Sequence, residues 1–138
     1  MIVLDTNLVS ALMRTPIDAP VAGWMSARAV DELAVTTISI FEIAYGIERL
    51  PRGKRRTALE GQFAAVMSAQ AFVLHVLSDA AAPRGGALLA RRRAMGRPGT
   101  NADMMIAGIA AELGASIATR NVRDFDGLGL TVIDPWTA

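Results

Sequence analysis

The chain has 138 residues, of which 52% are hydrophobic and 20% charged, and we expect it to form a single domain over residues 1–138. It contains no cysteine, which excludes disulfides and thiolate metal sites, so any bound metal should be a hard cation held by oxygen. The longest apolar stretch, 64–77, is broken by polar residues and is too short to span a bilayer, so no membrane segment is expected. The start MIVLD is predicted to be a strand instead of a secretion signal, so a cytoplasmic protein is expected.

The first half of the chain predicts two strands separated by helices. The apolar residues 2–4 precede Asp5-Thr6-Asn7, three residue types that cap helices well. Pro51 and Gly53 end a later helical run. The predicted order is strand 2–4, helix 8–13, helix 20–28, strand 33–36, helix 38–50 and helix 54–70.

The second half continues this alternation. Ser78 or Asp79 could cap a long arginine-bearing helix, and Gly114 should end a later one. The predicted order is strand 72–77, the arginine-bearing helix to 96–99, helix 102–113, strand 116–119 and strand 130–133. Alternating strands and helices predict an α/β fold with a mostly parallel central sheet between two layers of helices, in which ligands bind beyond the carboxyl ends of the strands.

Four acids are candidates for a metal site: Asp5, Glu42, Asp103 and Asp124. Two carboxylates about 5 Å apart repel by roughly 3 kcal/mol at an effective dielectric near 20, so converging acids either take up protons or bind a divalent cation. Each acid also has a structural interpretation. Asp5 could simply cap a helix, Glu42 could face solvent or pair with arginine, Asp103 could complete a capping box with Thr100, and Asp124 could be a turn residue.

The order of the four acids, with the residues around them, resembles PIN-domain ribonucleases, and more closely the VapC-type toxins of bacterial toxin–antitoxin pairs and their FitB-like relatives. The resemblance spans essentially the whole chain, and its carriers are IVLDTN, SISIFEIAYGIERL, GRPGTNADMMIAGIAA and IATRNVRDFDGLGLTVIDPW. It implies a PIN-like three-layer fold and a metal-dependent endoribonuclease. The oxygen ligands favour Mg²⁺ as the metal, with Mn²⁺ as the alternative.

By the same resemblance, Asp5, Glu42 and Asp103 match the three acids of the family motif. Thr6, Asn7 and Thr119 match polar positions that support the metal or its water. Asn121 stands two residues after Thr119, where many relatives carry Asp. Either Asp124 or Asn121 therefore fills the fourth position, and one metal or two would be held accordingly.

Thirteen of the fourteen cations are arginine, and most lie in two clusters, 49–56 and 84–97. Arginine forks suit phosphate, although solvated helix faces are an equal alternative. If the chain cuts RNA, the candidates for contact with the RNA backbone are Arg91, Arg92, Arg93 and Arg97. The resemblance further implies a transfer-RNA or ribosomal-RNA substrate, a VapB-type antitoxin, and a homodimer to which the helix with Tyr45, Ile47 and Leu50 could supply an apolar interface.

Two rival classes deserve comparison. A phosphoacceptor or haloacid-type phosphatase requires a lysine at a strand end, but the only lysine, Lys54, lies between predicted helices. A PIN-like module that binds nucleic acid or a protein but has lost its cutting activity stays open, with Asn121 as its supporting feature. The only histidine, His75, lies in an apolar strand and is predicted to be a core residue and not a catalytic base.

Overall fold

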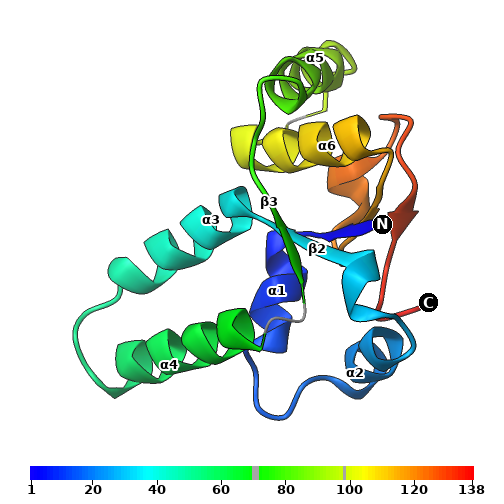
Figure 1. Ribbon diagram of the computed structural model, residues 1–138. Helices are drawn as coiled ribbons and strands as arrows, with labels where there is room; N and C mark the ends of the chain where they lie inside the picture. The colour runs from blue at the N-terminus through cyan, green and yellow to red at the C-terminus, as the bar shows by residue number, and fades with distance from the viewer. Residues whose placement is uncertain (70–71, 98) are drawn as a thin grey trace.

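A five-stranded parallel sheet forms the centre of the protein in a computed structural model that describes residues 1–69, 72–97 and 99–138 (Figure 1). The strand order is β3-β2-β1-β4-β5, and every neighbouring pair is parallel. The strands are β1 (Ile2–Leu4), β2 (Leu33–Thr36), β3 (Val73–His75), β4 (Ser116–Ala118) and β5 (Val132–Ile133). The carboxyl ends of β1, β2 and β4 therefore meet at one edge of the sheet.

Successive strand residues enter two separate hydrophobic cores, because side chains alternate across a sheet. Leu4, Leu33 and Val35 belong to one core, whereas Val3 and Ala34 belong to the other. All five are at most 2% exposed. The sheet is thus buried on both faces, as parallel sheets generally are.

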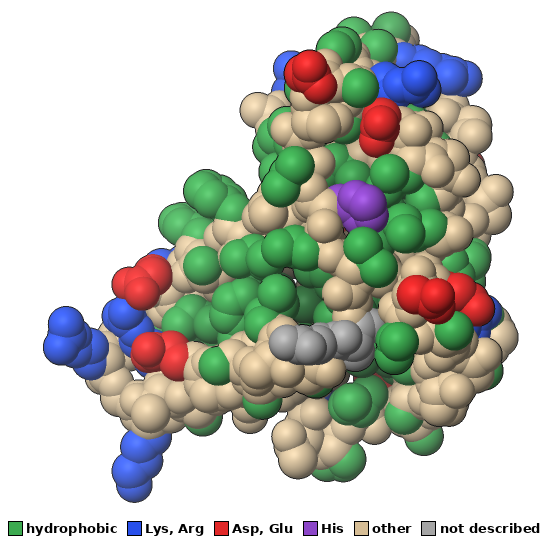
Figure 2. Space-filling model, viewed as in Figure 1, with side chains coloured by type: hydrophobic (Ala, Val, Ile, Leu, Met, Phe, Trp, Pro, Cys, Tyr) green, Lys and Arg blue, Asp and Glu red, His purple; other side chains and the backbone are tan. Residues whose placement is uncertain are grey.

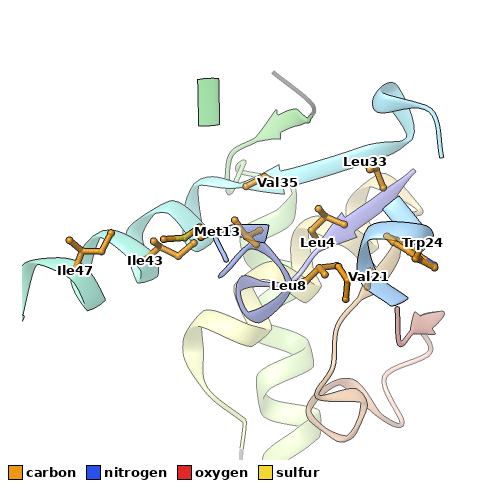
Figure 3. Close-up of a cluster of buried hydrophobic side chains, with 11 residues drawn as sticks. Leu4, Leu8, Met13, Val21, Trp24, Leu33, Val35, Ile43 and Ile47 are labelled. Atoms are coloured by element: carbon orange, nitrogen blue, oxygen red, sulfur yellow. The ribbon is translucent and has the colours of Figure 1, made fainter. Parts of the chain in front are cut away.

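Four helices cover the first face: α1 (Thr6–Leu12), α2 (Ala19–Ser26), α3 (Thr37–Glu48) and α4 (Lys54–Ser68). Leu8 of α1, Val21 and Trp24 of α2, and Ile43 and Ile47 of α3 pack around the strand residues of this core (Figure 3). Helices α3 and α4 form a hairpin that projects from the sheet (Figure 1).

The second face carries α6 (Asn101–Leu113), which α5 (Ala81–Ala94) covers from outside (Figure 1). Gly85 and Gly108 let these helices approach closely: a Cβ added at Gly108 would lie 2.6 Å from the Gly85 backbone nitrogen. The 3-10 helix η2 (Val122–Phe125) adds Phe125, which is 1% exposed, to the same core. The predicted α/β fold with helices on both faces is confirmed.

The predicted elements are found with small shifts at their ends. Thr36 caps α3, Thr100 caps α6, and Gly114 ends α6 in the left-handed conformation, at φ 63°. Helix α5 begins at Ala81, and Ser78 accepts a hydrogen bond from the Ala81 amide. The end of the predicted helix 54–70 and part of the predicted turn 96–99 fall outside the described residues.

Two short 3-10 helices, η1 (Val30–Glu32) and η2, were not predicted. His75 is half-buried in the edge strand β3, so it is less enclosed than the predicted core position. None of the helices in the described part of the chain combines the length and apolar character needed to cross a membrane.

Candidate metal centre and nucleic-acid interface

Asp5 lies directly after β1 and is the centre of a hydrogen-bond network at the sheet edge. Its backbone amide donates to Ala118 of β4, which continues the pairing of the two strands. Its carboxylate accepts three hydrogen bonds: Oδ1 from the Thr6 amide at 2.8 Å, and Oδ2 from Asn7 Nδ2 at 2.9 Å and Thr119 Oγ1 at 2.8 Å. The side chain is 4% exposed. Asp5 therefore caps helix α1, as the structural interpretation of its sequence position predicted. Its carboxylate is also held in a fixed orientation.

The Thr119 hydroxyl orients Asp5 from the end of β4. It donates to Asp5 and accepts from Asn7 Nδ2 at 3.1 Å and from the Asn121 amide at 3.0 Å. One donated and two accepted hydrogen bonds complete the capacity of a hydroxyl group. Thr119 is fully buried. Thr119 and Asn7, which the resemblance implies as supports of the metal or its water, both contact the Asp5 carboxylate.

Glu42 reaches the same edge from α3. Its Oε1 accepts a hydrogen bond from Thr6 Oγ1 at 2.6 Å, and Thr6 Oγ1 also lies 2.9 Å from Ser39 Oγ. Because the single Thr6 proton is donated to Glu42, Ser39 must be the donor in the second bond. The sequence analysis did not identify Ser39. Its signal was its position three residues before Glu42, which places both side chains on one helix face.

Asp103 lies in the first turn of α6, and its amide donates to the capping Thr100 hydroxyl at 3.0 Å. Burial is the main cause that raises the pKa of Asp103 to about 6, the charge of Asp5 is the next, and a hydrogen bond from Thr100 opposes the change. Asp124 and Glu42 contribute smaller increases. Asp103 therefore shares one electrostatic environment with the other three acids.

The pKa of Asp5 is also raised. Burial is the main cause, the hydrogen bonds from Thr119 and Thr6 oppose it, and the charges of Glu42 and Asp124 add to it. A carboxylate that lies near other carboxylates is more easily protonated, because its negative charge is repelled by theirs.

Asp124, and not Asn121, brings a fourth carboxylate to this group. Asp124 is half-buried in η2, and its charge acts on both Asp5 and Asp103. Asn121 has an exposed side chain, and the contact it makes with the network is through its backbone amide. The geometry thus favours Asp124 for the fourth acidic position.

The four acids are close enough for their charges to raise the pKa of Asp5 and Asp103. Their carboxylates do not, however, surround a single point at metal-ligand distance. Within the described residues, none of the ion pairs includes any of them, and no three acidic or histidine side chains already form a metal site. Mutual repulsion opposes a closer approach of the four carboxylates. Their donor atoms are all oxygen, which suits Mg²⁺ or Mn²⁺. Asp5 accepts three hydrogen bonds from described residues at about four lone-pair positions, which leaves one on Oδ1 for a cation.

Arginines of α5 lie at the opposite end of the molecule from those near the tip of the α3–α4 hairpin (Figure 2). Arg91, Arg93 and Arg97 are exposed, and Arg97 forms an ion pair with Asp126 at 3.0 Å. Arg92 is only 4% exposed, and its guanidinium donates to main-chain carbonyls. The prediction that Arg92 contacts the RNA backbone is therefore wrong, because its helical phase turns it inward.

Sequence comparison identifies the class of this fold. A sequence model of the PIN domain matches residues 2–129. The chain therefore belongs to the PIN-domain family.

Its relatives identify the subgroup of that family to which the chain belongs, the VapC-type toxins. It is 39% identical over 140 residues to plasmid stability protein StbB of Pseudomonas syringae pv. tomato, with 100% of both chains covered. It is 34% identical over 141 residues to VapC ribonuclease Y4jK of Sinorhizobium fredii, with 99% of this chain and 98% of that one covered. The structure of FitAcB from Neisseria gonorrhoeae has the same fold, with a TM-score of 0.82, 22% identity and 100% of both chains covered.

Proposed function

We propose that this protein is an Mg²⁺-dependent endoribonuclease that acts as the toxin of a VapBC-type toxin–antitoxin pair in the cytoplasm. One observation carries the proposal: Asp5, Glu42, Asp103 and Asp124 lie near one another at the carboxyl edge of the sheet, where burial and then the charges of neighbouring acids raise the pKa of Asp5 and Asp103. A protein rarely gathers acids in this way without a cation to offset their repulsion.

Each side chain has a distinct part in this proposal. Asp5 and Asp103 would hold the metal, with Glu42 and Asp124 completing the oxygen ligands, and Mn²⁺ could replace Mg²⁺. When bound, the ion acts as a Lewis acid that activates water and neutralises charge on a phosphodiester. Thr119 and Asn7 keep Asp5 Oδ2 occupied, so Oδ1 is the oxygen that would be left with a lone pair for the cation. Thr6 and Ser39 fix the Glu42 carboxylate.

The proposed substrate is a transfer RNA or a ribosomal RNA. Two relatives support RNA as the substrate class, VapC ribonuclease Y4jK and the tRNA(fMet)-specific endonuclease VapC of Shigella flexneri, the latter 27% identical over 106 residues. Exposed Arg91, Arg93 and Arg97 would position the RNA backbone without reading its sequence. The Arg97–Asp126 pair is solvent-exposed and therefore weak enough to exchange for a phosphate contact.

The proposed partners are a VapB-type antitoxin and a second copy of the chain. The support for an antitoxin is that solved neighbours are complexes, including DNA-bound VapBC from Salmonella typhimurium. On α3, Phe41 and Tyr45 are 73% and 62% exposed and could lie in an interface. Ile47 is 7% exposed and packs in the core, so the expectation that it contributes to an interface is wrong.

Induced expression in bacteria, followed by sequencing of RNA 5′ ends, tests the proposal. The set contains the native chain, Asp103→Asn, Asp5→Asn and the control Glu112→Gln, an exposed acid on the same helix as Asp103. We expect growth arrest and new RNA ends with the native chain and Glu112→Gln. Both site variants should lose cleavage by at least about a hundredfold, since each removes a metal ligand.

Circular dichroism of the purified variants must show that they are folded, because Asp5 anchors three hydrogen bonds. Unchanged growth and RNA ends with soluble, antitoxin-free native protein would instead favour the inactive binding module. Cleavage that survives in folded Asp103→Asn would overturn the assignment of the site.

A further inference from the structure

Arg92 is a charged side chain that the proposed chemistry does not use, yet it is almost completely buried. It lies in the last turn of α5 with 4% of its surface exposed, between exposed Arg91 and Arg93. Buried charges are costly unless hydrogen bonds satisfy them. Nη1 donates to the Asp126 carbonyl at 2.9 Å, and Nη2 donates to the Arg123 carbonyl.

The two carbonyls that Arg92 binds lie on either side of Asp124. Arg123 immediately precedes Asp124, and Asp126 follows it by two residues at the end of η2. A cation at the carboxyl end of a helical turn is favourable because the terminal carbonyls carry partial negative charge. Arg92 thus fixes the main chain that carries the fourth acid.

The aliphatic part of Arg92 contacts the segment that leads into α6. A Cβ added at Gly99 would lie 3.1 Å from Arg92 Cγ, so Gly99 permits this close approach. The Arg97 amide also donates to the Arg92 carbonyl at 3.2 Å. This segment ends at Thr100, which caps the helix turn that holds Asp103.

We infer that Arg92 is a positioning residue that sets the separation of Asp103 and Asp124 and so prepares the site for its cation. The inference rests on the proposed metal site. Arg92 joins η2, which carries Asp124, to the segment before α6, which carries Asp103. A cavity of about 430 Å³ lies beside this contact and is lined by Arg92, Arg97, Arg123 and Asp126.

The planar fork of arginine is essential to this role. Its two terminal nitrogens reach two carbonyls at once, whereas a lysine ammonium at the same place would be a single point donor. Arg92→Lys should retain the charge and most of the packing but lose one of the two main-chain bonds. Arg92→Met should lose both.

Mn²⁺ binding measured by electron paramagnetic resonance tests the inference without relying on RNA cleavage. We expect Arg92→Lys to bind Mn²⁺ about tenfold more weakly than the native protein, and Arg92→Met up to about a hundredfold, as for other residues that orient metal ligands. The matched controls are Arg84→Lys and Arg84→Met, at an exposed position on the same helix, and both should bind like the native protein.

Thermal unfolding and amide exchange separate positioning from general stability. A purely structural role would lower the unfolding temperature of Arg92→Lys but leave Mn²⁺ affinity unchanged well below that temperature. A positioning role additionally speeds exchange of the Asp126 amide, which donates to the Arg123 carbonyl. Native Mn²⁺ affinity in folded Arg92→Lys would overturn the inference, and so would failure of both Arg92 variants to fold at low temperature. If the native protein itself binds no Mn²⁺, the proposed metal site fails instead, and the inference fails with it.

Discussion

Asp5 and Asp103 have the same chemistry but different surroundings, and this difference divides their parts in the site. Three hydrogen bonds hold the Asp5 carboxylate in place from α1 and β4. Asp103 receives less support and keeps a pKa near 6 because of burial and the charge of Asp5. The protonation state of Asp103 therefore changes between mildly acidic and neutral solution.

The metal-free protein should lose stability as the pH rises from about 4 to about 6. The folded state binds the Asp103 proton more tightly than the unfolded state, where the pKa is 3.8, so stability is greatest below the unfolded value and declines through the folded value. Asp103→Asn should remove much of this dependence and stabilise the metal-free protein at pH 7 by roughly 1 kcal/mol, allowing for the partial exposure of the side chain.

Urea unfolding in EDTA at several pH values measures this effect, with Glu112→Gln as the control. A native protein whose stability rises between pH 4 and 6, with the variant following the same curve, would contradict the assignment. Deprotonation of Asp103 is also required for metal binding, so Mn²⁺ affinity should increase over the same pH range.

Some residue contacts could be predicted from local sequence and others could not. Thr100, Gly114 and the residues after β1 act on neighbours one to four positions away, so their roles follow from spacing. The bond between Ser39 and Thr6 joins positions 33 apart, so the spacing of Ser39 from Glu42 indicates a shared helix face but does not identify Thr6 as the partner. Arg91, Arg92 and Arg93 are identical in type, and which of them is buried depends on how α5 is rotated against η2.

At the level of elements, α5 and α6 are joined by an unusually close packing of two glycines. A Cβ at Gly108 would lie 2.6 Å from the Gly85 nitrogen and 2.7 Å from the Ala81 carbonyl oxygen. These are main-chain atoms, which cannot move aside as a flexible side chain can. The helices must separate to admit even one methyl group, and this would displace the first turn that carries Asp103.

Gly108→Ala should therefore destabilise the protein by about 1 to 3 kcal/mol, as overpacking usually does. Gly86→Ala provides a matched control on α5, because its added Cβ meets nothing within 4 Å. That control should be neutral or stabilising by up to about 1 kcal/mol, since alanine favours helix. The midpoints of urea unfolding of Gly108→Ala and Gly86→Ala test this prediction. Equal stability of the two variants would refute the packing argument.

Element types were more predictable than their limits. The strand 33–36 is found as predicted because its apolar residues stand immediately before a capping threonine. The predicted strand 72–77 is reduced to Val73–His75, since β3 pairs only with β2 and its pairing extends over three residues. The residues at which a strand begins and ends depend on the neighbouring strands with which it pairs, and not on its own sequence alone.

At the level of the whole molecule, arginines gather at two separate ends, one on α5 and one at the α3–α4 hairpin. Arg91 and Arg93 belong to α5, on the side of the sheet that carries Asp103 and Asp124, whereas Arg55 lies in the first turn of α4 and Arg52 shortly before it, at the turn of the α3–α4 hairpin. Figure 2 shows basic side chains at both ends of the molecule. The net charge is only +1, so binding of a polyanion depends on local charge and not on the total.

Replacing both Arg91 and Arg93 with glutamine should weaken RNA binding and reduce the slope of log K against log salt by roughly 1.4, at about 0.7 per single-strand phosphate contact. The double variant Arg52→Gln, Arg55→Gln removes the same charge from the other end and should change the slope less. Filter binding in the Asp103→Asn background avoids cleavage during the measurement. A larger effect from the hairpin variant would move the proposed RNA path to that end.

The arrangement of the sheet also determines when the acids can assemble. They come from positions 5, 42, 103 and 124, and the amide of Thr119, which orients Asp5, is hydrogen-bonded to Ile133. A chain still emerging from the ribosome therefore lacks the fourth carboxylate until residue 124 has left the exit tunnel, and lacks the pairing of Thr119 with β5 until residue 133 has left it. If the four acids form the proposed site, a nascent chain that stops before residue 133 therefore holds that site incomplete.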